Sequence, residues 1–516
     1  MEFQRTKNST RTFIFGVIEK IATIFLPFLV RTVIIRQLGI DYAGLSSLFV
    51  SVLNVLNIGE LGVASAATFC MYDAVSKDDT SKINALLRFV RNFYKILGFA
   101  ILAVGLALMP LLRFLIKGEY PSDINLYVLY IFYLLNAIVS YLGFAYRGIL
   151  LQAYQRGDVT YRIQTLLEVL KCICQILAIV LFKNYYLAII CLLVSTLLNT
   201  LFTGLASKKM FPKYHPEGKL SEEDKRIIKS KVIFLALFSI SAKLITSADN
   251  IVISSFSGLV ATGIYGNYTY ISNAVLGFVL VAYTSVAPAI GNCLVLKSKE
   301  ENIKLFDAIS LGSFWIYAWC TICLLCLYQP FISIWVGEEN QLPFMTVIAI
   351  SLLFFSNAST QFFSSCYIST AGLWNKSFLP KLLASVLNLA LDLALVHSLG
   401  TFGIVIASFA SYYCILLPLD MFITYKHILK VDRPVWNVFK TLGIQTITVV
   451  GVSAIMLFLC SLITDTGIWA LIKKTVICLT FPILMLFSIF SGTDAFKNLA
   501  SHIRGLFSEA RKESNL

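Results

Sequence analysis

The sequence predicts an all-α polytopic membrane protein with about fourteen transmembrane helices, and three observations support this prediction. Hydrophobic residues make up 58% of the 516 residues, only 14% of the residues are charged, and the mean hydropathy is +0.80. In a soluble protein of this length, roughly a quarter of the residues are charged. Apolar runs of ~20 residues also follow one another with little polar sequence between them, which is typical of membrane spans.

The apolar runs predict where the helices lie, because a backbone exposed to lipid must satisfy its own hydrogen bonds. The runs do not alternate as the strands of a transmembrane barrel would. The first run follows a polar, basic N-terminus and has no cleavage site, so it is expected to be a retained helix. The expected helices cover residues 12–37, 43–72, 93–116, 124–150, 160–182, 186–206, 232–256, 263–290, 304–328, 343–369, 376–397, 401–424, 439–462 and 472–491.

The net charge of +14 is interpreted as topology rather than as a nucleic-acid surface. Lys and Arg gather in alternate loops, as cytoplasmic loops of membrane proteins do. This pattern predicts a multi-pass protein with both termini in the cytoplasm and no nucleic-acid partner. Lys473 and Lys474 break the pattern, because they lie near the outer end of the last expected helix.

The chain repeats itself at an offset of about 219 residues. Gly39 matches Gly258 and Gly44 matches Gly263, and the same offset within one or two positions relates Asn54 to Asn273, Pro110 to Pro330 and Ala153 to Ala371. Six helices in each copy predict two copies with the same membrane orientation. The expected domains are a lobe at 1–206, a cytoplasmic basic linker with a short amphipathic helix at 207–231, a lobe at 232–425, two extra helices at 426–491 and a cytoplasmic tail at 492–516.

Charged residues inside the expected helices are the candidate functional residues, because each costs ~2.5–3.5 kcal/mol at the centre of a membrane. Arg31 corresponds to Asn250 in the second copy, so Arg31 and Asp249 are expected at a similar depth, with Lys243 nearby. Glu60 is a comparable candidate, with a packing or ion-pair role equally open.

Other charges in the helices have simpler explanations. Arg36 is near a helix end and can reach the interface. Glu168 and Lys171 are three residues apart and can neutralise each other. Arg147 lies near the inner end of its helix.

Nothing in the sequence predicts an enzyme, a cofactor or a metal site. The four histidines are scattered, the longest expected loop is the linker at 207–231, and no GxxxxGK[ST] phosphate loop occurs. Cys320, Cys323 and Cys326 have a CxxCxxC spacing, which is interpreted as one face of a helix filled with small apolar side chains.

Three segments resemble a known family. These are RTVIIRQLGIDYAGLSSL at 31–48, NIGELGVASA at 57–66 and GIYGNY at 263–268. They are similar to the Wzx-type polysaccharide biosynthesis flippases of the multidrug/oligosaccharidyl-lipid/polysaccharide (MOP) exporter superfamily. The resemblance covers essentially the whole chain, and its motifs are more specific for the family than for the substrate.

The resemblance implies two six-helix lobes around a central cavity in a bacterial cytoplasmic membrane. It implies a flippase that moves an undecaprenyl pyrophosphate-linked oligosaccharide repeat unit for cell-surface polysaccharide biosynthesis, by alternating access of the lobes. Membrane lipids, a polysaccharide polymerase, glycosyltransferases and a coupling Na⁺ or H⁺ are the further implied partners. The expected pyrophosphate-binding cations are Arg31, Lys243, Arg36 and Arg147, and the expected gate or ion-coupling acids are Asp249 and Glu60.

Two questions stay open at this point. The first concerns six polar residues in the expected helices, whose side chains either face the sugar or pack between helices. These residues are Asn267, Tyr268, Tyr270, Asn273, Asn357 and Gln361. The alternative function is a cation-coupled multidrug or small-metabolite antiporter of the same fold. That alternative predicts more acids than cations in the cavity, whereas cations here at least match the acids.

Overall fold

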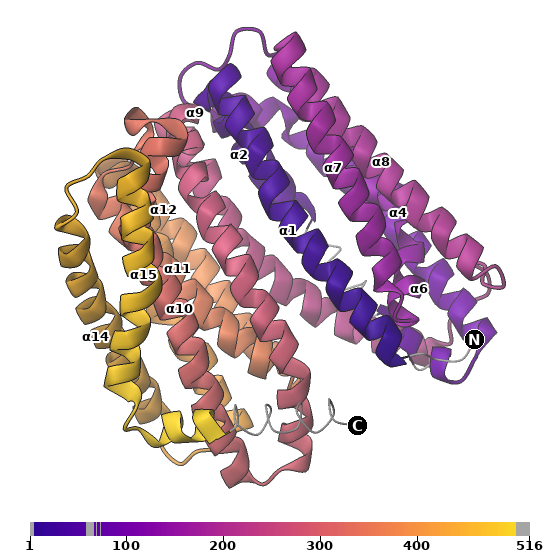
Figure 1. Cartoon of the computed structure of the whole chain (residues 1–516). Helices are drawn as coiled ribbons and strands as arrows, with labels where there is room; N and C mark the ends of the chain where they lie inside the picture. The colour runs from indigo at the N-terminus through magenta and orange to yellow at the C-terminus, as the bar shows by residue number, and fades with distance from the viewer. Residues whose placement is uncertain (1–4, 58–66, 69, 73, 502–516) are drawn as a thin grey trace. The chain divides into compact units, whose positions relative to one another are not determined.

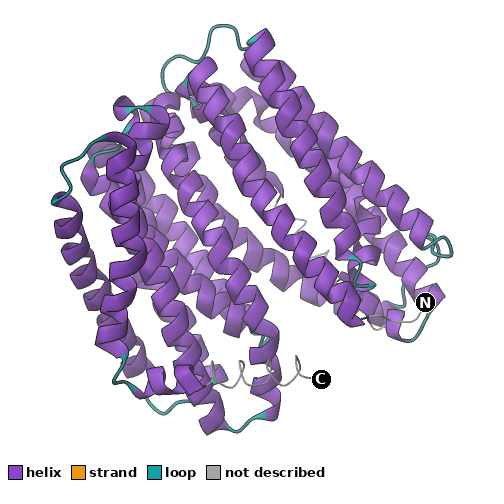
Figure 2. Ribbon diagram, in the orientation of Figure 1, coloured by secondary structure: helices purple, strands orange, loops and turns teal. Residues whose placement is uncertain are grey.

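A computed structural model describes residues 5–501 except 58–66, 69 and 73. Every regular element of that part is a helix, as Figures 1 and 2 show. The contacts divide the chain into two compact units, unit 1 at Met1–Gly266 and unit 2 at Asn267–Leu516. The division falls inside one long helix, α9 (Glu222–Leu296), and the predicted lobe boundaries stay a prediction.

Unit 1 is a helical bundle in which α1 packs along α7, α7 along α8, and α5 against α4 and α8. Besides the first part of α9, its elements are α1 (Arg5–Gln37), α2 (Ile40–Leu56), α4 (Thr80–Leu108), η2 (Met109–Leu115), α5 (Leu126–Leu142), η3 (Ala145–Arg147), α6 (Gly148–Ala153), α7 (Gly157–Phe182) and α8 (Tyr185–Met210).

Unit 2 packs α10 against α11, α14 and α15, and α11 against α12. Figure 1 shows α14 and α15 side by side. Its elements after α9 are α10 (Lys299–Val336), η4 (Glu338–Asn340), α11 (Phe344–Phe362), η5 (Phe363–Ile368), α12 (Trp374–Ala410), η6 (Ser411–Leu416), α13 (Leu417–Ile423), η7 (Thr424–Ile428), α14 (Pro434–Ser461) and α15 (Gly467–Phe490).

Ten helices in the described part are long and apolar enough to cross a membrane, or eleven if the bent pair Leu126–Leu142 and Ala145–Ala153 is one span. Two of the ten, Ser247–Leu296 and Trp374–Ile428, contain 50 and 55 residues. A single crossing needs ~20 residues. Each of these two is interrupted by a glycine with non-helical angles, Gly258 or Gly400. The all-helical membrane fold is thus confirmed, and the total of fourteen crossings stays a prediction.

The helices extend beyond the apolar runs where polar residues cap them. The predicted helix at 93–116 begins at Thr80, because the Asp79 carboxylate accepts a hydrogen bond from the Lys82 amide at 2.9 Å. The predicted helix at 304–328 begins at Lys299, after a capping box formed by Ser298 and Glu301. Hydropathy marks the membrane-embedded part of a helix, whereas the cap marks its first turn.

The predicted helix at 124–150 is wrong at its second end. α5 ends at Leu142, and η3 and α6 follow at a bend of 44°. Gly143 ends α5 at this bend and makes room for α8, because a Cβ there would lie 2.9 Å from the Thr200 hydroxyl. The bend places Arg147 in η3, outside the straight helix that the sequence predicted.

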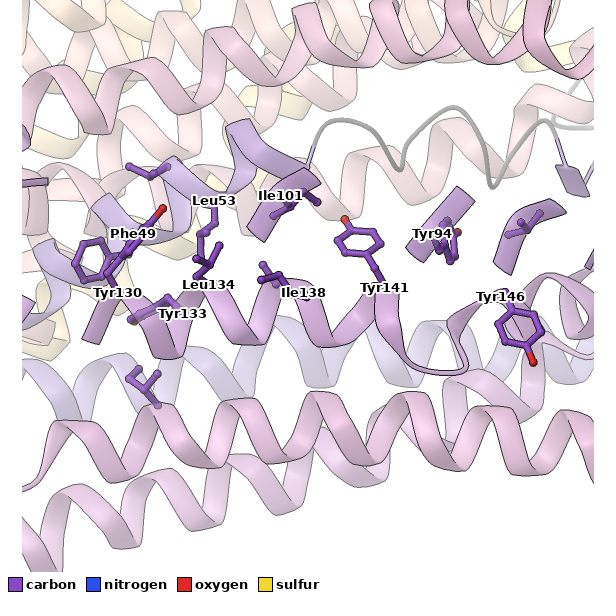
Figure 3. Packing of buried hydrophobic residues seen from close by; sticks show 14 of the residues in the cluster. Phe49, Leu53, Tyr94, Ile101, Tyr130, Tyr133, Leu134, Ile138, Tyr141 and Tyr146 are labelled. Atoms are coloured by element: carbon purple, nitrogen blue, oxygen red, sulfur yellow. The ribbon is translucent and has the colours of Figure 1, made fainter. Parts of the chain in front are cut away.

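The core of unit 1 is built from aromatic and branched side chains of α2, α4 and α5 (Figure 3). The Phe49 ring lies edge-on to Tyr130 and Tyr133, with centroid distances of 5.6 and 5.4 Å. The Tyr130 hydroxyl donates to the Gly105 carbonyl at 3.1 Å, which satisfies its polar group inside the bundle. In a membrane such close packing holds helices together, because the lipid is as apolar as the side chains and the hydrophobic effect contributes little to helix association.

The connection between α8 and α9 is shorter and more buried than the predicted solvated linker at 207–231. It covers 211–221 only, and Phe211, Tyr214 and Leu220 are buried against unit 1. The predicted short amphipathic helix is the beginning of α9, which starts at Glu222 and continues to the kink at Gly258. The Pro/Gly pattern predicted the break correctly, but the packing of the aromatic side chains depends on the tertiary fold.

Candidate functional site

The two copies of the repeat make the same backbone turns. Gly39 separates α1 from α2 with φ 123°, and Gly258 interrupts α9 with φ 88°. The next pair, Gly118 with φ 82° and Gly337 with φ 97°, again lies 219 positions apart. Glycine enters this region of φ without the penalty that a Cβ imposes. The predicted offset of 219 residues thus relates glycines that share a positive φ at these two pairs of positions.

Gly44 and Gly263, which the repeat pairs, contact each other within unit 1. A Cβ on Gly44 would lie 2.0 Å from the Leu259 carbonyl oxygen, and a Cβ on Gly263 would lie 2.4 Å from the Ile40 carbonyl oxygen. Ile40 and Leu259 are themselves related by the same offset. The contact is thus reciprocal, as a twofold contact between two equivalent segments must be. Small residues at this crossing let α2 and the second half of α9 approach backbone to backbone.

Arg31 extends from α1 to this crossing. Its Nη1 donates to the Ser47 hydroxyl at 3.4 Å and its Nη2 to the Gly263 carbonyl at 3.2 Å. A Cβ on Gly266 would lie 2.7 Å from Nη2, so the glycine leaves room for the guanidinium. Arg31 is half-buried. The predicted cation is therefore held beside the second copy's glycines, at a contact that joins both halves of the repeat.

The acid and amide next to each other on α9 have separate partners. Asp249 is buried, and its Oδ2 accepts a hydrogen bond from the Tyr265 hydroxyl at 2.8 Å. Asn250, the counterpart of Arg31, donates through Nδ2 to the Ser51 hydroxyl at 3.0 Å. Lys243 lies half-buried on the same helix, nearly two turns before Asp249. These contacts bring Arg31 and the Asp249 group to residues only two positions apart, Gly263 and Tyr265.

Arg147 lies at a different place in unit 1. It is only 5% exposed, its Nη2 donates to the Tyr214 carbonyl at 3.4 Å, and its Cζ lies 5.9 Å from the centroid of the Tyr146 ring. Its Nη1 is buried without a hydrogen-bond partner within the described part of the chain. A buried guanidinium N–H without an acceptor costs free energy, and an anion at that position would recover it.

The loop that covers Arg147 is itself held by polar contacts. Tyr214 hydrogen bonds with the Tyr154 hydroxyl and donates to Asp78 Oδ1 at 3.4 Å, and Lys213 pairs with the same carboxylate at 2.8 Å. The hydrogen bond from Lys213 and its positive charge hold the pKa of Asp78 below its ordinary value, and Tyr214 adds to the effect. Burial raises the pKa of Tyr214. These contacts hold the loop in place, and its Tyr214 carbonyl accepts the hydrogen bond from Arg147.

The remaining predicted residues lie elsewhere or outside the described residues. Arg36 is exposed in the last turn of α1, as expected for an interface position. Glu60 lies outside the described residues. Glu168 and Lys171 form the expected pair at 2.6 Å. Among the polar side chains that either face the sugar or pack between helices, Tyr268 is fully buried and its hydroxyl donates to Gln329 Oε1 at 2.8 Å.

Sequence reasoning missed Lys381, a second buried cation. It is 5% exposed on α12 and donates to the Ser364 hydroxyl at 2.8 Å. Asp420 is fully buried on α13, where its Oδ1 accepts from Ser377 at 2.6 Å. The Asp420 Oδ2 has no hydrogen-bond partner in the described part of the chain. Lys381 was overlooked because it follows a proline near the start of an apolar run, where a lysine reads as an interface anchor.

A third polar group lies further along α12. Asn388 and Asp392 are both fully buried, and the Asn388 Nδ2 donates to the Ser408 hydroxyl at 2.9 Å and faces Asp392 Oδ1 at 3.4 Å. The i, i+4 spacing of an amide and an acid in an apolar helix was visible in the sequence, but Ser408 comes from beyond the break at Gly400. Unit 2 thus buries acids together with a cation.

These features define a class: an all-helical, multi-pass membrane protein with at least ten apolar helices in its described part and a repeated pair of glycine turns. A family model described as "Polysaccharide biosynthesis protein" matches residues 9–293, which is more than half of the chain. The chain belongs to this polysaccharide biosynthesis protein family. None of the curated proteins matches the sequence.

Solved structures of the MOP superfamily share the fold. The lipid II flippase MurJ in an inward closed conformation superposes with a TM-score of 0.66 at 16% identity, over 92% of this chain and 98% of that one. An inward-facing MATE multidrug transporter gives 0.58 at 14%, over 82% and 95%. A MOP superfamily transporter from Pyrococcus furiosus gives 0.55 at 12%, over 83% and 97%. At these identities the likeness establishes the fold of the chain.

Proposed function

We propose that this protein moves an undecaprenyl pyrophosphate-linked oligosaccharide across a bacterial cytoplasmic membrane by alternating access of its two lobes. Membership of the polysaccharide biosynthesis protein family supports a role in polysaccharide biosynthesis. The fold shared with a lipid II flippase supports the movement of a lipid-linked substrate across the membrane. Flippases and transporters of this kind are generally not enzymes. The glycan would come from glycosyltransferases and pass on to a polymerase.

The observation that carries the proposal is the position of Arg31. A charged residue within a membrane span costs ~2.5–3.5 kcal/mol, so a span keeps one where the charge has a use. Arg31 donates to a serine hydroxyl and a backbone carbonyl, and Gly266 leaves the space that its Nη2 occupies. A guanidinium fixed in this way offers parallel donors to a pyrophosphate, whose charge needs compensation in a medium of low dielectric constant.

Arg147 supports the proposal independently. Its buried Nη1 lacks an acceptor among the described residues, and a phosphate oxygen is an acceptor of the right charge. We propose that Arg147 receives the pyrophosphate at the inner end, that Arg31 and Lys243 hold it at mid-depth, and that Arg36 releases it at the outer interface. Lys243 adds a movable point charge rather than a bidentate contact.

Ion coupling forms a separate part of the proposal. Asp249 and Glu60 are the candidate coupling acids, and Asp249 accepts a hydrogen bond from the Tyr265 hydroxyl. The buried acids of unit 2, Asp392 and Asp420, have the same chemistry: a carboxylate inside a membrane is stable when it binds a proton, a metal cation or a neighbouring charge. Collapse of both the Na⁺ and H⁺ gradients would slow transport if these acids couple it.

The test compares two ligands, a pyrophosphate lipid and a cationic dye, and four proteins: the wild type and three arginine variants. Purified protein in detergent is titrated with undecaprenyl pyrophosphate and with the cationic dye ethidium, and binding is followed by intrinsic fluorescence. We expect saturable binding of the pyrophosphate lipid to the wild type. Arg31→Ala and Arg147→Ala should each weaken this binding by about ten- to a hundredfold, because each variant loses a charge-assisted hydrogen bond. The matched control is Arg433→Ala, because Arg433 is exposed at the start of α14.

The same titration separates the alternative. Saturable ethidium binding without binding of the pyrophosphate lipid would favour the cation-coupled antiporter and overturn the flippase. Equal affinity of wild type and both arginine variants for the lipid would remove the electrostatic argument. Reconstitution in vesicles with a fluorescent pyrophosphate-linked lipid then measures movement itself, with the same control variant.

A further inference from the structure

Three cysteine thiols from three helices of unit 2 come together. Cys326 lies on α10, Cys460 on α14 and Cys478 on α15, and their three Sγ atoms all lie within 4.8 Å of one another. Their exposed fractions are 6%, 5% and 0%. The residues are 134 and 18 positions apart in the sequence. No motif of the sequence predicts this group, and of the CxxCxxC cysteines only Cys326 belongs to it.

The packing fixes the position of the third thiol. Pro482 stands four residues after Cys478 and has no N–H, so the Cys478 carbonyl has no donor from its own helix. Two side chains of α10 replace that donor: Trp319 Nε1 at 2.9 Å and the Cys323 thiol at 3.3 Å. In a membrane a backbone carbonyl needs such a partner. α15 is therefore held against α10 at the register that brings Cys478 to Cys326.

The surroundings of the three thiols are apolar. Ile322, Val452 and Met456 are buried around them in one cluster. The group of potential metal ligands in the described part of the chain consists of the three cysteines, with no histidine or carboxylate among them. Lys474 lies one helical turn before Cys478 on α15. A cation near a cysteine stabilises negative charge on its sulfur.

This geometry fits one soft metal ion. Sulfur ligands bound at ~2.3 Å around a single ion lie roughly 4 Å apart, which is within the observed spacing. Zinc takes four ligands in structural sites, whereas this group supplies three sulfurs among apolar neighbours. Thiol and thioether ligands select Cu(I) among monovalent ions. One thiolate also neutralises a monovalent ion, whereas a divalent ion would require two thiolates in an apolar region.

We propose that Cys326, Cys460 and Cys478 form a three-sulfur site for a monovalent soft cation, Cu(I) or its analogue Ag(I). The site joins the two C-terminal helices to α10, because each helix supplies one ligand. It also gives a role to the charge of Lys474, which the topology rule left unexplained. Cys460 is next to the last residue of α14, so this ligand lies close to the α14–α15 connection. Metal binding of this kind stabilises the folded state.

The experiment measures metal bound to the full-length protein. Purified protein is titrated with Cu(I) under reducing conditions against a competing chelator, and with Ag(I), and retained metal is counted after desalting. We expect one ion per chain, a higher Tm when the ion is bound, and loss of at least a hundredfold in affinity for Cys326→Ser and Cys460→Ser. The control is Cys414→Ser, because Cys414 is an exposed cysteine of the same unit.

A second measurement needs no variant. X-ray absorption of the Cu(I)-loaded wild-type protein should give three sulfur neighbours. Two sulfur neighbours, or nitrogen and oxygen neighbours, would overturn the site, as would stoichiometric binding that survives Cys326→Ser. Absence of one-to-one binding in the wild type would overturn it as well, and preferential binding of Zn²⁺ would overturn the monovalent assignment.

Discussion

The segments 31–51 and 250–270 are equivalent parts of the repeat, and they differ in charge while sharing their glycines. Both contain a break before the second helix, at Gly39 just ahead of Ile40 and at Gly258, and both contain the crossing glycine, Gly44 or Gly263. At the position of Arg31 the second copy has Asn250. Both side chains find hydrogen-bond partners, but only the first brings a fixed positive charge.

This difference separates what the fold requires from what the function requires. The glycines are in both copies because the two backbones touch there, with carbonyl oxygens where a Cβ would be. The charge is in one copy only, so the crossing itself does not need it. A neutral amide makes an equivalent hydrogen bond at far lower cost in a membrane. The following predictions test this separation, from the largest effect to the smallest.

The largest effect is expected at the shared framework. Gly44→Ala places a Cβ 2.0 Å from the Leu259 carbonyl, and backbone cannot move aside as a flexible side chain can. We expect a loss of roughly 3 kcal/mol or more in stability, with little monodisperse protein after solubilisation. Gly451→Ala on α14 is the control, because nothing lies within 4 Å of its Cβ position. A Gly44→Ala variant as stable as the Gly451→Ala variant would contradict the close contact.

The next largest effect concerns transport rather than stability. Arg31→Asn gives the first copy the residue of the second, so the crossing keeps a polar side chain and loses its charge. We expect near-complete loss of movement of pyrophosphate-linked lipid in vesicles, with Tm changed by only a few degrees. Asn250→Ala should leave transport largely intact. If Asn250→Ala lowers transport as much as Arg31→Asn, the asymmetry between the copies has no functional meaning.

A smaller effect follows from moving Arg31 without replacing it. Gly266→Ala would bring a Cβ to 2.7 Å from Nη2 and 2.8 Å from the Ser47 hydroxyl, so the guanidinium must shift. Both neighbours are ends of side chains, so folding should survive. We expect about tenfold weaker binding of undecaprenyl pyrophosphate, because one charge-assisted hydrogen bond is disturbed. Unchanged affinity would mean that the position of Arg31 beside Gly263 is unimportant.

The smallest effect is expected for a charged pair that neutralises itself. Glu168 and Lys171 are 2.6 Å apart on α7, and their side chains are 16% and 14% exposed. Replacing both, as Glu168→Gln/Lys171→Met, should change stability by about 0.5 kcal/mol and leave transport unchanged. Thermal unfolding and the vesicle assay measure the two quantities. A large loss of transport would move this pair into the functional site.

Hydropathy and spacing predicted the fold well because lipid imposes simple rules. Long apolar runs must be helices, and an offset of 219 residues marked the two copies before any contact was known. The candidate site was predicted only in part. Arg31 and Asp249 were singled out because a charge in an apolar run is conspicuous. Lys381 was missed, because a lysine close to the end of a run looks the same whether it is buried or reaches the interface.

The sequence by itself determined the membrane class, the family and the repeated glycines, since these depend on composition and on local backbone freedom. Only the tertiary structure decided which residues meet. It placed Gly44 in contact with Gly263 and directed Arg31 to the second copy of the repeat. It also buried Arg147 beside Tyr214 and brought together three cysteines from three different helices. Spacing along one helix determines which residues lie on the same face of that helix. Only the packing between helices determines which residues of other helices that face contacts.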